Sequence, residues 1–490
     1  MKLSKSKYCR AVQCKKMLWL EKYKPNEMTQ LHNESVLEQG NMVHEVARYL
    51  FGSHINIQYT ENLTQMVKDT YSTIDSYQDV IITEASFNYQ NNFCSVDILK
   101  KQANNYEIYE VKSSTDLKDV YINDVSYQYY VLTNLGFNIT KCLIVVINNK
   151  YVRLGNLELD KLFLKLDITK DVIKLQDVVK DNLQSINEYM QREKEPNDDI
   201  DLKCFKPYAC PFFKYCTKHL PQDNVFSLAS MHTSKKMALY KAGVYSYEQL
   251  LEHDLNEKYH QQIIYQLSDK IDYIDEEKIL GFLNTLSYPL YFLDFETYQM
   301  PIPLYEGISP YEKIPFQYSV HYLNNVHDEL KHQEFLAEAG IDPRRSLAEK
   351  LIKDIPKDVC VLAYNMSFEK SVIKKLALMY SDLRDRLMNI YDNMKDLMIP
   401  FRERYYYNKL MQGSYSIKYV LPALYPDDAS LNYQNLELVH NGTEAMDNYM
   451  ALVGMEEEKL KYTREQLLKY CELDTYAMVK IFEKLIEVTK

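Results

Sequence analysis

The spacing of apolar residues predicts a helix, a set of strands and a second helix in the first third of the chain. Residues 34–52 carry apolar positions at helical spacing and end on a glycine, as helices often do. Three strand-like runs follow, at 80–90, 93–101 and 105–114. A helix is then predicted around 120–135, before the apolar strand CLIVVI at 142–147. Strands, a helix and a further strand in this order are typical of an α/β domain.

The pattern changes twice toward the C-terminus. Residues 161–196 have helical spacing, and 222–285 contain mostly short helical stretches, which indicate a connector or a small helical subdomain. From residue 288 the stretch YPLYFLDFET forms an apolar strand that ends in acids, and strands and helices alternate after it. The predicted fold class is therefore α/β with a helical connector, divided into domains at 1–221, 222–285 and 286–490.

Length and composition agree with this division. A chain of 490 residues is expected to form two or three domains, and a hydrophobic content of 46% is enough for a core in each. The net charge of −11 argues against nucleic-acid binding by bulk charge alone. It does not exclude a nuclease, because a basic groove can exist within a negative average.

The ends and apolar runs of the sequence bear on its location. The first residues, MKLSKSKYCR, are basic, but the apolar segment of a secretory signal does not follow them. The longest apolar runs are too short to span a bilayer. We therefore expect a cytoplasmic protein without membrane contact. In that reducing compartment the nine cysteines are not expected to form disulfides, and a cluster of them favours metal binding.

Asp97, Glu110 and Lys112 form the first candidate site. Glu110 and Lys112 are two residues apart, so their side chains lie on one face of a strand. A short turn would pair the strand that carries Asp97 beside them. Two carboxylates and an ammonium on one face can hold Mg²⁺ or Mn²⁺ and a scissile phosphate, with the lysine orienting or activating water. The alternative interpretation is a solvated sheet face, where such residues are common.

Two more residues give this set a family resemblance. His44 lies on the preceding predicted helix and Gln128 on the following one. The ordered series of His, Asp, Glu-x-Lys and Gln resembles the PD-(D/E)XK nucleases of the RecB-like branch, which have a restriction-endonuclease-like fold. The resemblance implies that His44 is a metal ligand beside Asp97 and Glu110. It also implies that Gln128 contributes to the active site and to DNA contacts.

The segment CFKPYACPFFKYC contains Cys204, Cys210 and Cys216. Some RecB-like nucleases hold an iron–sulfur cluster with one cysteine before the nuclease core and three after it, and CKKMLWL is similar to their N-terminal cysteine segment. The resemblance implies Cys14 as the fourth ligand, with Cys9 in reserve. Four thiolates suit a [4Fe–4S] cluster or a structural Zn²⁺, and a lone cysteine with a widely spaced trio favours the cluster. Four unrelated buried cysteines are the remaining alternative.

A second set of acids lies in the C-terminal domain. FLDFETY ends a strand with Asp294 and Glu296 on the same face. The stretch VCVLAYNMSFEKSVIKKLA predicts a strand that runs into a helix, with Glu369 in the first turn. On the amphipathic helix near the end of the chain, Tyr470 and Asp474 are four residues apart and lie on one face.

This order of motifs resembles the DEDD exonucleases of the tyrosine-bearing subclass, which have a ribonuclease H-like fold. The resemblance implies two-metal hydrolysis at 3′ ends, in which the four acids bind two ions and Tyr470 positions the attacking water. That family has aspartate where Glu369 stands, and Asp396 is the second choice for this acid. FLDFETY and GSYSIKYVLPAL, with the cysteine segments, also resemble an uncharacterised bacterial family that joins such a domain to a RecB-like N-terminus.

The sequence therefore predicts a metal-dependent nuclease that hydrolyses DNA in end processing, repair or defence, with Mg²⁺ or Mn²⁺ at both sites. One alternative is a nucleic-acid-binding scaffold whose nuclease folds no longer cut, which the Glu369 departure motivates. Another is an exonuclease that acts on RNA. The sequence contains no Walker motif, so unwinding would require a helicase or another partner.

Overall fold

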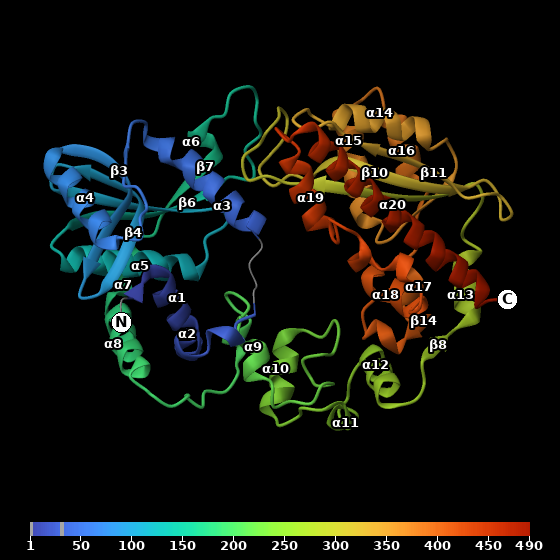
Figure 1. The fold of residues 1–490 in the computed structure, drawn as a ribbon, viewed down its shortest axis with the longest axis horizontal. Coiled ribbons are helices and arrows are strands. Elements are labelled where there is room, and N and C mark those ends of the chain that lie inside the picture. The colour runs from blue at the N-terminus through green and yellow to red at the C-terminus, as the bar shows by residue number, and fades with distance from the viewer. Residues whose placement is uncertain (1–2, 30–33) are drawn as a thin grey trace. The chain divides into compact units, whose positions relative to one another are not determined.

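A computed structural model describes residues 3–29 and 34–490. The chain divides into two compact units, each built around a central sheet (Figure 1). Unit 1 comprises residues 1–219 and 300–312, and unit 2 comprises residues 220–299 and 313–490. The α/β class predicted from the sequence is confirmed.

The boundaries of the two units differ from those of the predicted domains. Residues 222–285, predicted as a separate connector, belong to unit 2, and residues 300–312 group with unit 1. Ile302 from this second segment lies in a hydrophobic cluster of unit 1, against which Tyr311 packs. The Tyr311 hydroxyl also donates to the carbonyl of Ser113. Long-range contacts of this kind leave no trace in local composition.

The sheet of unit 1 contains an antiparallel meander and a parallel crossover. Its strands are β1 Leu3–Ser4, β2 Ile55–Asn56, β3 Asp79–Tyr89, β4 Asn92–Gln102, β5 Asn105–Lys112, β6 Asn138–Ile147 and β7 Phe163–Asp167. The order is β2-β3-β4-β5-β6-β7, with β1 paired to β4. β3, β4 and β5 are antiparallel neighbours, β6 is parallel to β5, and β7 is antiparallel to β6. The predicted meander, helix and strand are confirmed, but the all-helical prediction for 161–196 is wrong because β7 lies within it.

Helices cover both faces of this sheet. They are α1 Lys5–Gln13, α2 Lys15–Tyr23, α3 Glu34–Ala47, α4 Leu63–Ser76, α5 Asp119–Asn134, α6 Leu159–Leu162, α7 Thr169–Lys174, α8 Gln176–Met190 and α9 Phe213–Cys216. Val43 and Ala47 of α3 share a buried cluster with Tyr109 and Val111 of β5. Because side chains alternate along a strand, Glu110 then lies on the opposite face from Tyr109 and Val111.

The central sheet of unit 2 is mixed. The strands of this unit are β8 Asp272–Ile274, β9 Leu290–Tyr298, β10 Ile314–Leu323, β11 Lys331–Leu336, β12 Cys360–Ala363, β13 Met394–Asp396 and β14 Tyr406–Asn408. The central order is β11-β10-β9-β12-β13, and β8 pairs with β14 separately. β9, β10 and β11 are antiparallel, and β12 and β13 run parallel to β9. Ser319 of β10 lies opposite Asp294, and Gln317 lies opposite Glu296.

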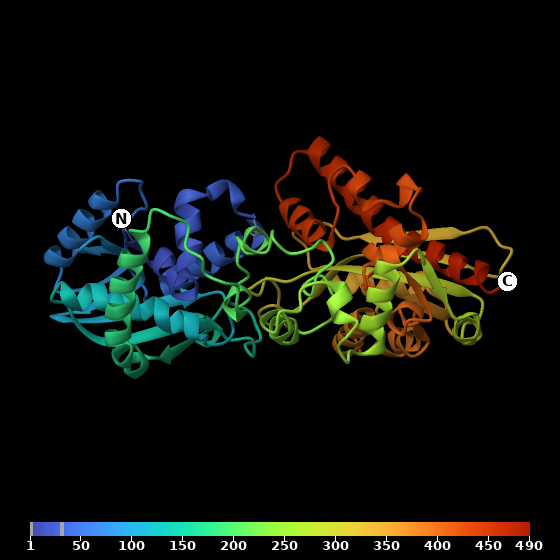
Figure 2. The ribbon, with the colours of Figure 1, turned by 90° about the horizontal axis from the view of Figure 1, so that it is seen from below.

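The helices of unit 2 lie on both faces of this sheet. They are α10 Thr233–Lys241, α11 Tyr247–Leu250, α12 Glu257–Leu267, α13 Glu276–Leu283, α14 Arg344–Asp354, α15 Ser367–Met379, α16 Arg384–Asp392, α17 Ile399–Arg402, α18 Ile417–Leu424, α19 Gly442–Ala451 and α20 Glu457–Glu487. In Figure 2 the red helix α20 and the orange helices α14–α16 lie on opposite sides of the sheet. No helix in the described part of the chain combines the length and apolar character needed to cross a bilayer.

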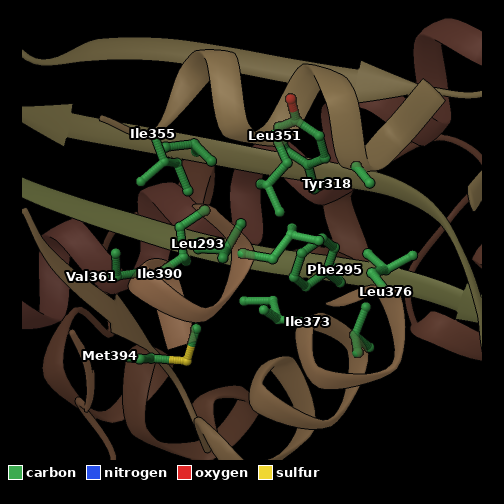
Figure 3. Close-up of a cluster of buried hydrophobic side chains, with 14 of the residues drawn as sticks. Leu293, Phe295, Tyr318, Leu351, Ile355, Val361, Ile373, Leu376, Ile390 and Met394 are labelled. Carbon is green, nitrogen blue, oxygen red and sulfur yellow. The ribbon is translucent and has the colours of Figure 1, made fainter. Parts of the chain in front are cut away.

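A hydrophobic core of unit 2 fixes which side chains of β9 face α20. Leu293 and Phe295 pack with Leu351 of α14 and Ile373 of α15 on one face (Figure 3). Strand alternation therefore turns Asp294 and its neighbour Glu296 to the other face, where α20 lies. Burial of the apolar residues of β9 in this core thus orients its acidic side chains toward α20.

Candidate active sites

Glu110 and Lys112 form the centre of a charged cluster in unit 1. Lys112 Nζ donates to Glu110 Oε1 at 2.6 Å and to Asp124 Oδ2 of α5 at 2.7 Å. Burial opposes ionisation of Glu110, yet Lys112 and Lys5 hold the pKa of this carboxyl below its ordinary value. Burial also works against the charge of Lys112, but Glu110 and Asp124 raise its pKa. Lys112 is therefore an ammonium ion near neutral pH.

Helix α5 contributes two polar side chains to this cluster. Gln128 Nε2 donates to Glu110 Oε2 at 2.7 Å and to Asp124 Oδ1 at 3.2 Å. Gln128 is fully buried, and its Oε1 has no hydrogen-bond partner among the described residues. Gln128 was predicted from the sequence and Asp124 was not, although their four-residue spacing puts both on one face of α5. Asp124 belongs to the cluster because it accepts hydrogen bonds from both Lys112 and Gln128.

Lys5 supplies a second ammonium ion from the N-terminal helix α1. Its Nζ is 2.8 Å from Glu110 Oε1, and 3.7 and 3.8 Å from oxygens of Asp124 and Asp97. Burial opposes its charge, but these acids raise the pKa of Lys5 well above its usual value. The sequence analysis missed this residue, because a lysine in a basic N-terminal segment carries no distinguishing pattern.

His44, Glu84 and Asp97 form the group in unit 1 that is best arranged to bind a divalent ion. One possible ligand atom of each lies within 4.8 Å of the others, and His44 Nδ1 is 3.8 Å from Asp97 Oδ2. Glu84 lies on β3 between Thr83 and Ala85, which pair with the two neighbours of Asp97 on β4. It has a φ of 58°, which breaks the regular alternation of that strand. Glu110, expected as the third ligand, accepts hydrogen bonds from Lys5, Lys112 and Gln128 instead.

Asp294, Glu296 and Asp474 form an acid group in unit 2, in which Glu296 and Asp474 are buried and Asp294 is partly buried. One carboxylate oxygen of each lies within 4.8 Å of the others. Burial raises the pKa of Asp294 and Glu296 well above the ordinary values, and the charge of Asp474 adds to both shifts. Burial likewise raises the pKa of Asp474 to about 6. Carboxylates that repel one another in a desolvated site are stabilised by a bound cation.

Glu369 lies near this group without belonging to its closest set. It is in the first turn of α15, is 2% exposed, and its Oε2 has no hydrogen-bond partner among the described residues. Burial raises its pKa to about 8, with Asp396 adding to the shift. Its charge also raises the pKa of Asp294 and Glu296, which places it within their electrostatic range.

Asp396, the second choice for the helix acid, is engaged in holding a turn. Its Oδ1 accepts the backbone N–H groups of Asn365 and Met398, both at 3.0 Å, and Arg402 Nη1 lies 3.3 Å from Oδ2. Asn365 has a φ of 70°, a left-handed conformation that asparagine tolerates better than most residues. Asp396 therefore fixes the turn that leads into α15 and Glu369.

Three further side chains surround Asp474. Tyr470, one turn earlier on α20, lies close enough to Asp474 to lower its pKa. Tyr433 donates its hydroxyl to Asp474 Oδ1 at 2.7 Å. The charge of Lys418 lowers the pKa of both Asp474 and Glu296. Tyr433 and Lys418 were not predicted, since one tyrosine among 44 and one lysine carry no local signal.

The four predicted cluster cysteines line one small cavity in unit 1: Cys14, Cys204, Cys210 and Cys216. Cys14 lies between α1 and α2, and the trio lies in and before α9. Gln13 Nε2 ties the two segments together by donating to the carbonyls of Lys203 (2.7 Å) and Tyr208 (2.8 Å). Cys9 does not line this cavity; burial raises its pKa to about 12, with the charge of Asp124 adding to the shift.

The chemistry of these thiols bears on what they could bind. Four cysteines that line one cavity offer a donor set of four thiolates. Such a set suits a [4Fe–4S] cluster or a structural Zn²⁺. Among the described residues, the groups whose possible ligand atoms lie within 4.8 Å of one another contain no cysteine.

Comparison with known proteins identifies one recognised region. A family described as a domain of unknown function (DUF2779) matches residues 291–416. The match includes Asp294, Glu296 and Glu369 and ends before Tyr470 and Asp474. Among the curated proteins, none matches the chain. The comparison thus groups three of the acids in one recognised domain and assigns no chemistry to them.

Proposed function

We propose that this protein is a metal-dependent nuclease that hydrolyses phosphodiester bonds in DNA. Unit 2 acts as a 3′–5′ exonuclease of the DEDD type on a ribonuclease H-like fold. Unit 1 is a second nuclease of the PD-(D/E)XK, RecB-like type on a restriction-endonuclease-like fold. The order β11-β10-β9-β12-β13 with α20 against β9 supports the first assignment, and Glu110, Lys112 and Gln128 on β5 and α5 support the second.

The observation that carries the proposal is the acid group of unit 2. Asp294, Glu296 and Asp474 are close together, and burial raises the pKa of each carboxyl. The charge of Asp474 adds to the shifts of Asp294 and Glu296. Glu369 adds a further buried acid with an oxygen that lacks a hydrogen bond among the described residues. Oxygen-rich sites of this kind suit Mg²⁺ or Mn²⁺. When bound, these ions supply Lewis-acid activation of the scissile phosphate and of water.

The neighbouring tyrosines have separate parts in this proposal. Burial and the acids raise the pKa of Tyr470, so its hydroxyl stays protonated and can orient the attacking water. Tyr433 donates to Asp474 Oδ1 and fixes the orientation of that carboxylate. Glu369 reaches toward the group from α15 with one methylene more than the aspartate found in the resembling family.

In unit 1 the lysines are proposed to bind the scissile phosphate. Lys112 and Lys5 are both cations near neutral pH, because buried acids raise the pKa of each. A lysine that holds its proton this firmly orients and polarises a phosphate better than it removes a proton from water. His44, Glu84 and Asp97 would hold Mg²⁺ or Mn²⁺ beside them.

The cysteine cavity is proposed to hold a [4Fe–4S] cluster with a structural role. Cys14 would be joined through it to Cys204, Cys210 and Cys216, which ties the two ends of unit 1 together. The residues that line the cavity include none of the charged residues proposed for cleavage. A zinc ion remains the alternative cofactor, and iron and acid-labile sulfide in anaerobically purified protein distinguish the two.

The proposed activity is tested with labelled single- and double-stranded DNA in Mg²⁺, Mn²⁺ or EDTA, alongside a matched RNA. The variants are Lys112→Ala and Asp294→Ala, with the exposed residues Lys118→Ala and Glu329→Ala as matched controls. We expect metal-dependent degradation of DNA in the wild type and controls. Lys112→Ala should lose the activity of unit 1, and Asp294→Ala should lose the activity of unit 2. Degradation unchanged by both site variants contradicts the proposal, and degradation of RNA alone changes its substrate.

A catalytically degenerate nucleic-acid-binding scaffold is the second candidate function. The position of Glu369 outside the closest acid group favours it, because the fourth acid of the exonuclease set is then displaced. This candidate predicts binding of the same oligonucleotides by the wild type without turnover in either metal. Any turnover that Asp294→Ala abolishes excludes it for unit 2.

A further inference from the structure

A pair of histidines lies face to face on the edge strand β11 and its neighbour β10 in unit 2. His321 of β10 and His332 of β11 are directly opposite residues, and their rings stack with centroids 4.4 Å apart. Glu472 of α20 approaches from the helix, with Oε1 3.9 Å from His332 Nδ1. One nitrogen of each ring and one oxygen of Glu472 all lie within 4.8 Å of one another.

Two hydroxyl groups hold the other nitrogen of each ring. His321 Nδ1 is 2.8 Å from Thr475 Oγ1, and His332 Nε2 is 2.9 Å from Ser319 Oγ. The two hydroxyls are themselves 2.6 Å apart. His321 Nε2 and His332 Nδ1 are then the nitrogens left to face a ligand. Metal-binding histidines are usually oriented by a hydrogen bond at the second nitrogen, as here.

Burial and access are also suitable for an ion. His321 is 4% exposed, whereas the side chains of His332 and Glu472 are 23% and 49% exposed, which leaves a route from solvent. Burial and the neighbouring His332 lower the pKa of His321 to about 3, so its ring is neutral near pH 7.

We propose that His321, His332 and Glu472 bind a transition-metal ion, with Zn²⁺ as the best fit. Two imidazoles and a carboxylate are the donors that zinc accepts, whereas Mg²⁺ prefers oxygen ligands alone. The group shares no residue with the acid group of Asp294, Glu296 and Asp474. It is therefore a separate site, and its existence does not depend on nuclease activity.

The proposed site joins elements that also carry the acid group. Glu472 and Thr475 flank Asp474 on α20, and Ser319 lies opposite Asp294 in the sheet. An ion bound to both histidines and to Glu472 would fasten α20 to β10 and β11 next to the acids. Its proposed role is to hold the helix in register with the sheet.

The test is Co²⁺ binding by the full-length protein in excess Mg²⁺, followed by visible absorption, with Co²⁺ as a coloured substitute for Zn²⁺. The variants are His332→Gln and Glu472→Gln, and the matched control is His327→Gln, an exposed histidine between β10 and β11. Subtracting the variant spectra from the wild-type spectrum removes any signal from the four cysteines of the cysteine cavity, which lie in unit 1. Asp294→Asn tests whether the ion occupies the acid group instead.

We expect wild type, His327→Gln and Asp294→Asn to share a cobalt band that both ligand variants lack. Loss of an orienting partner weakens metal binding by about 10–100-fold, so loss of a ligand should weaken Co²⁺ binding by more. Glu472→Gln, at a half-exposed position, decides the matter if His332→Gln fails to fold. The same spectrum in wild type and Glu472→Gln, or loss of the band in Asp294→Asn alone, overturns the proposal.

Discussion

Replacing Glu369 by glutamine should make unit 2 of the metal-free protein less sensitive to pH. Burial raises the pKa of Glu369 from 4.5 to about 8, so the folded protein keeps this proton over a range in which the unfolded chain loses it. The stability it confers is complete below the unfolded pKa and falls as pH rises toward the folded pKa. Glutamine is neutral throughout and removes this part of the pH dependence.

The size of the effect follows from the distance between the two pKa values. Each pH unit between them changes the free energy of unfolding by about 1.36 kcal/mol. From pH 4.5 to pH 7 Glu369 ionises in the unfolded chain but keeps its proton in the folded protein. This difference lowers the free energy of unfolding by about 3 kcal/mol. For a unit of this size that is a fall in Tm of roughly 6–12 °C. The fall in Tm with rising pH should therefore be larger in the wild type than in Glu369→Gln by this amount.

Thermal unfolding followed by two probes measures the difference. Trp19 is the only tryptophan and lies in unit 1, so its fluorescence follows that unit alone, while far-UV circular dichroism follows both. The transition seen only by circular dichroism belongs to unit 2. The protein is kept free of divalent ions and compared at pH 5 and pH 7.5.

The matched control is Glu369→Asp, which keeps the charge and should keep the pH dependence. Added Mg²⁺ should reduce the difference between wild type and Glu369→Gln, because an ion at the acid group stabilises the ionised carboxyl. Identical pH dependence of wild type and Glu369→Gln in the absence of metal would refute the reasoning. Glu369 would then not be a buried, high-pKa acid.

Two other substitutions test separate parts of the sites. Tyr433→Phe removes a hydrogen bond that lowers the pKa of Asp474. The acidic limb of the pH profile of the Mg²⁺-dependent activity should therefore move up by roughly one pH unit. An unshifted pH profile would count against this contact. Cys14→Ala should lower the iron content of anaerobically purified protein, whereas Cys9→Ala should retain it, since Cys9 lies outside the cysteine cavity. The reverse pattern of iron content would show that the wrong cysteine was assigned.

Local patterns in the sequence were sufficient for much of the fold. The strand that ends in FLDFETY and the helix that carries Tyr470 and Asp474 are present as predicted. In both, the spacing of apolar residues fixes the face on which the acids lie, so short-range periodicity contains the information. β7 was missed because a strand of five residues between helical stretches is too short for its alternation to be recognised.

The residues that sequence reasoning missed reach their sites through long-range packing. Lys5 lies 105 positions before Glu110 in the chain. Glu84 joins His44 and Asp97 only because its strand is kinked at a positive φ. These contacts depend on how α1 and β3 pack against the sheet. No local spacing in the sequence encodes them.

The most direct test of the proposed exonuclease uses protein in which the site of unit 1 is inactivated. The measurement is release of nucleotides from the 3′ end of DNA. The substrate is single-stranded DNA with a 3′-terminal label, incubated with Lys112→Ala protein in Mg²⁺. We predict stepwise release of labelled mononucleotides by Lys112→Ala and no release by the double variant Lys112→Ala/Asp294→Asn. No release by either protein in Mg²⁺ or Mn²⁺, or equal release by both, would contradict the assignment of the acid group in unit 2.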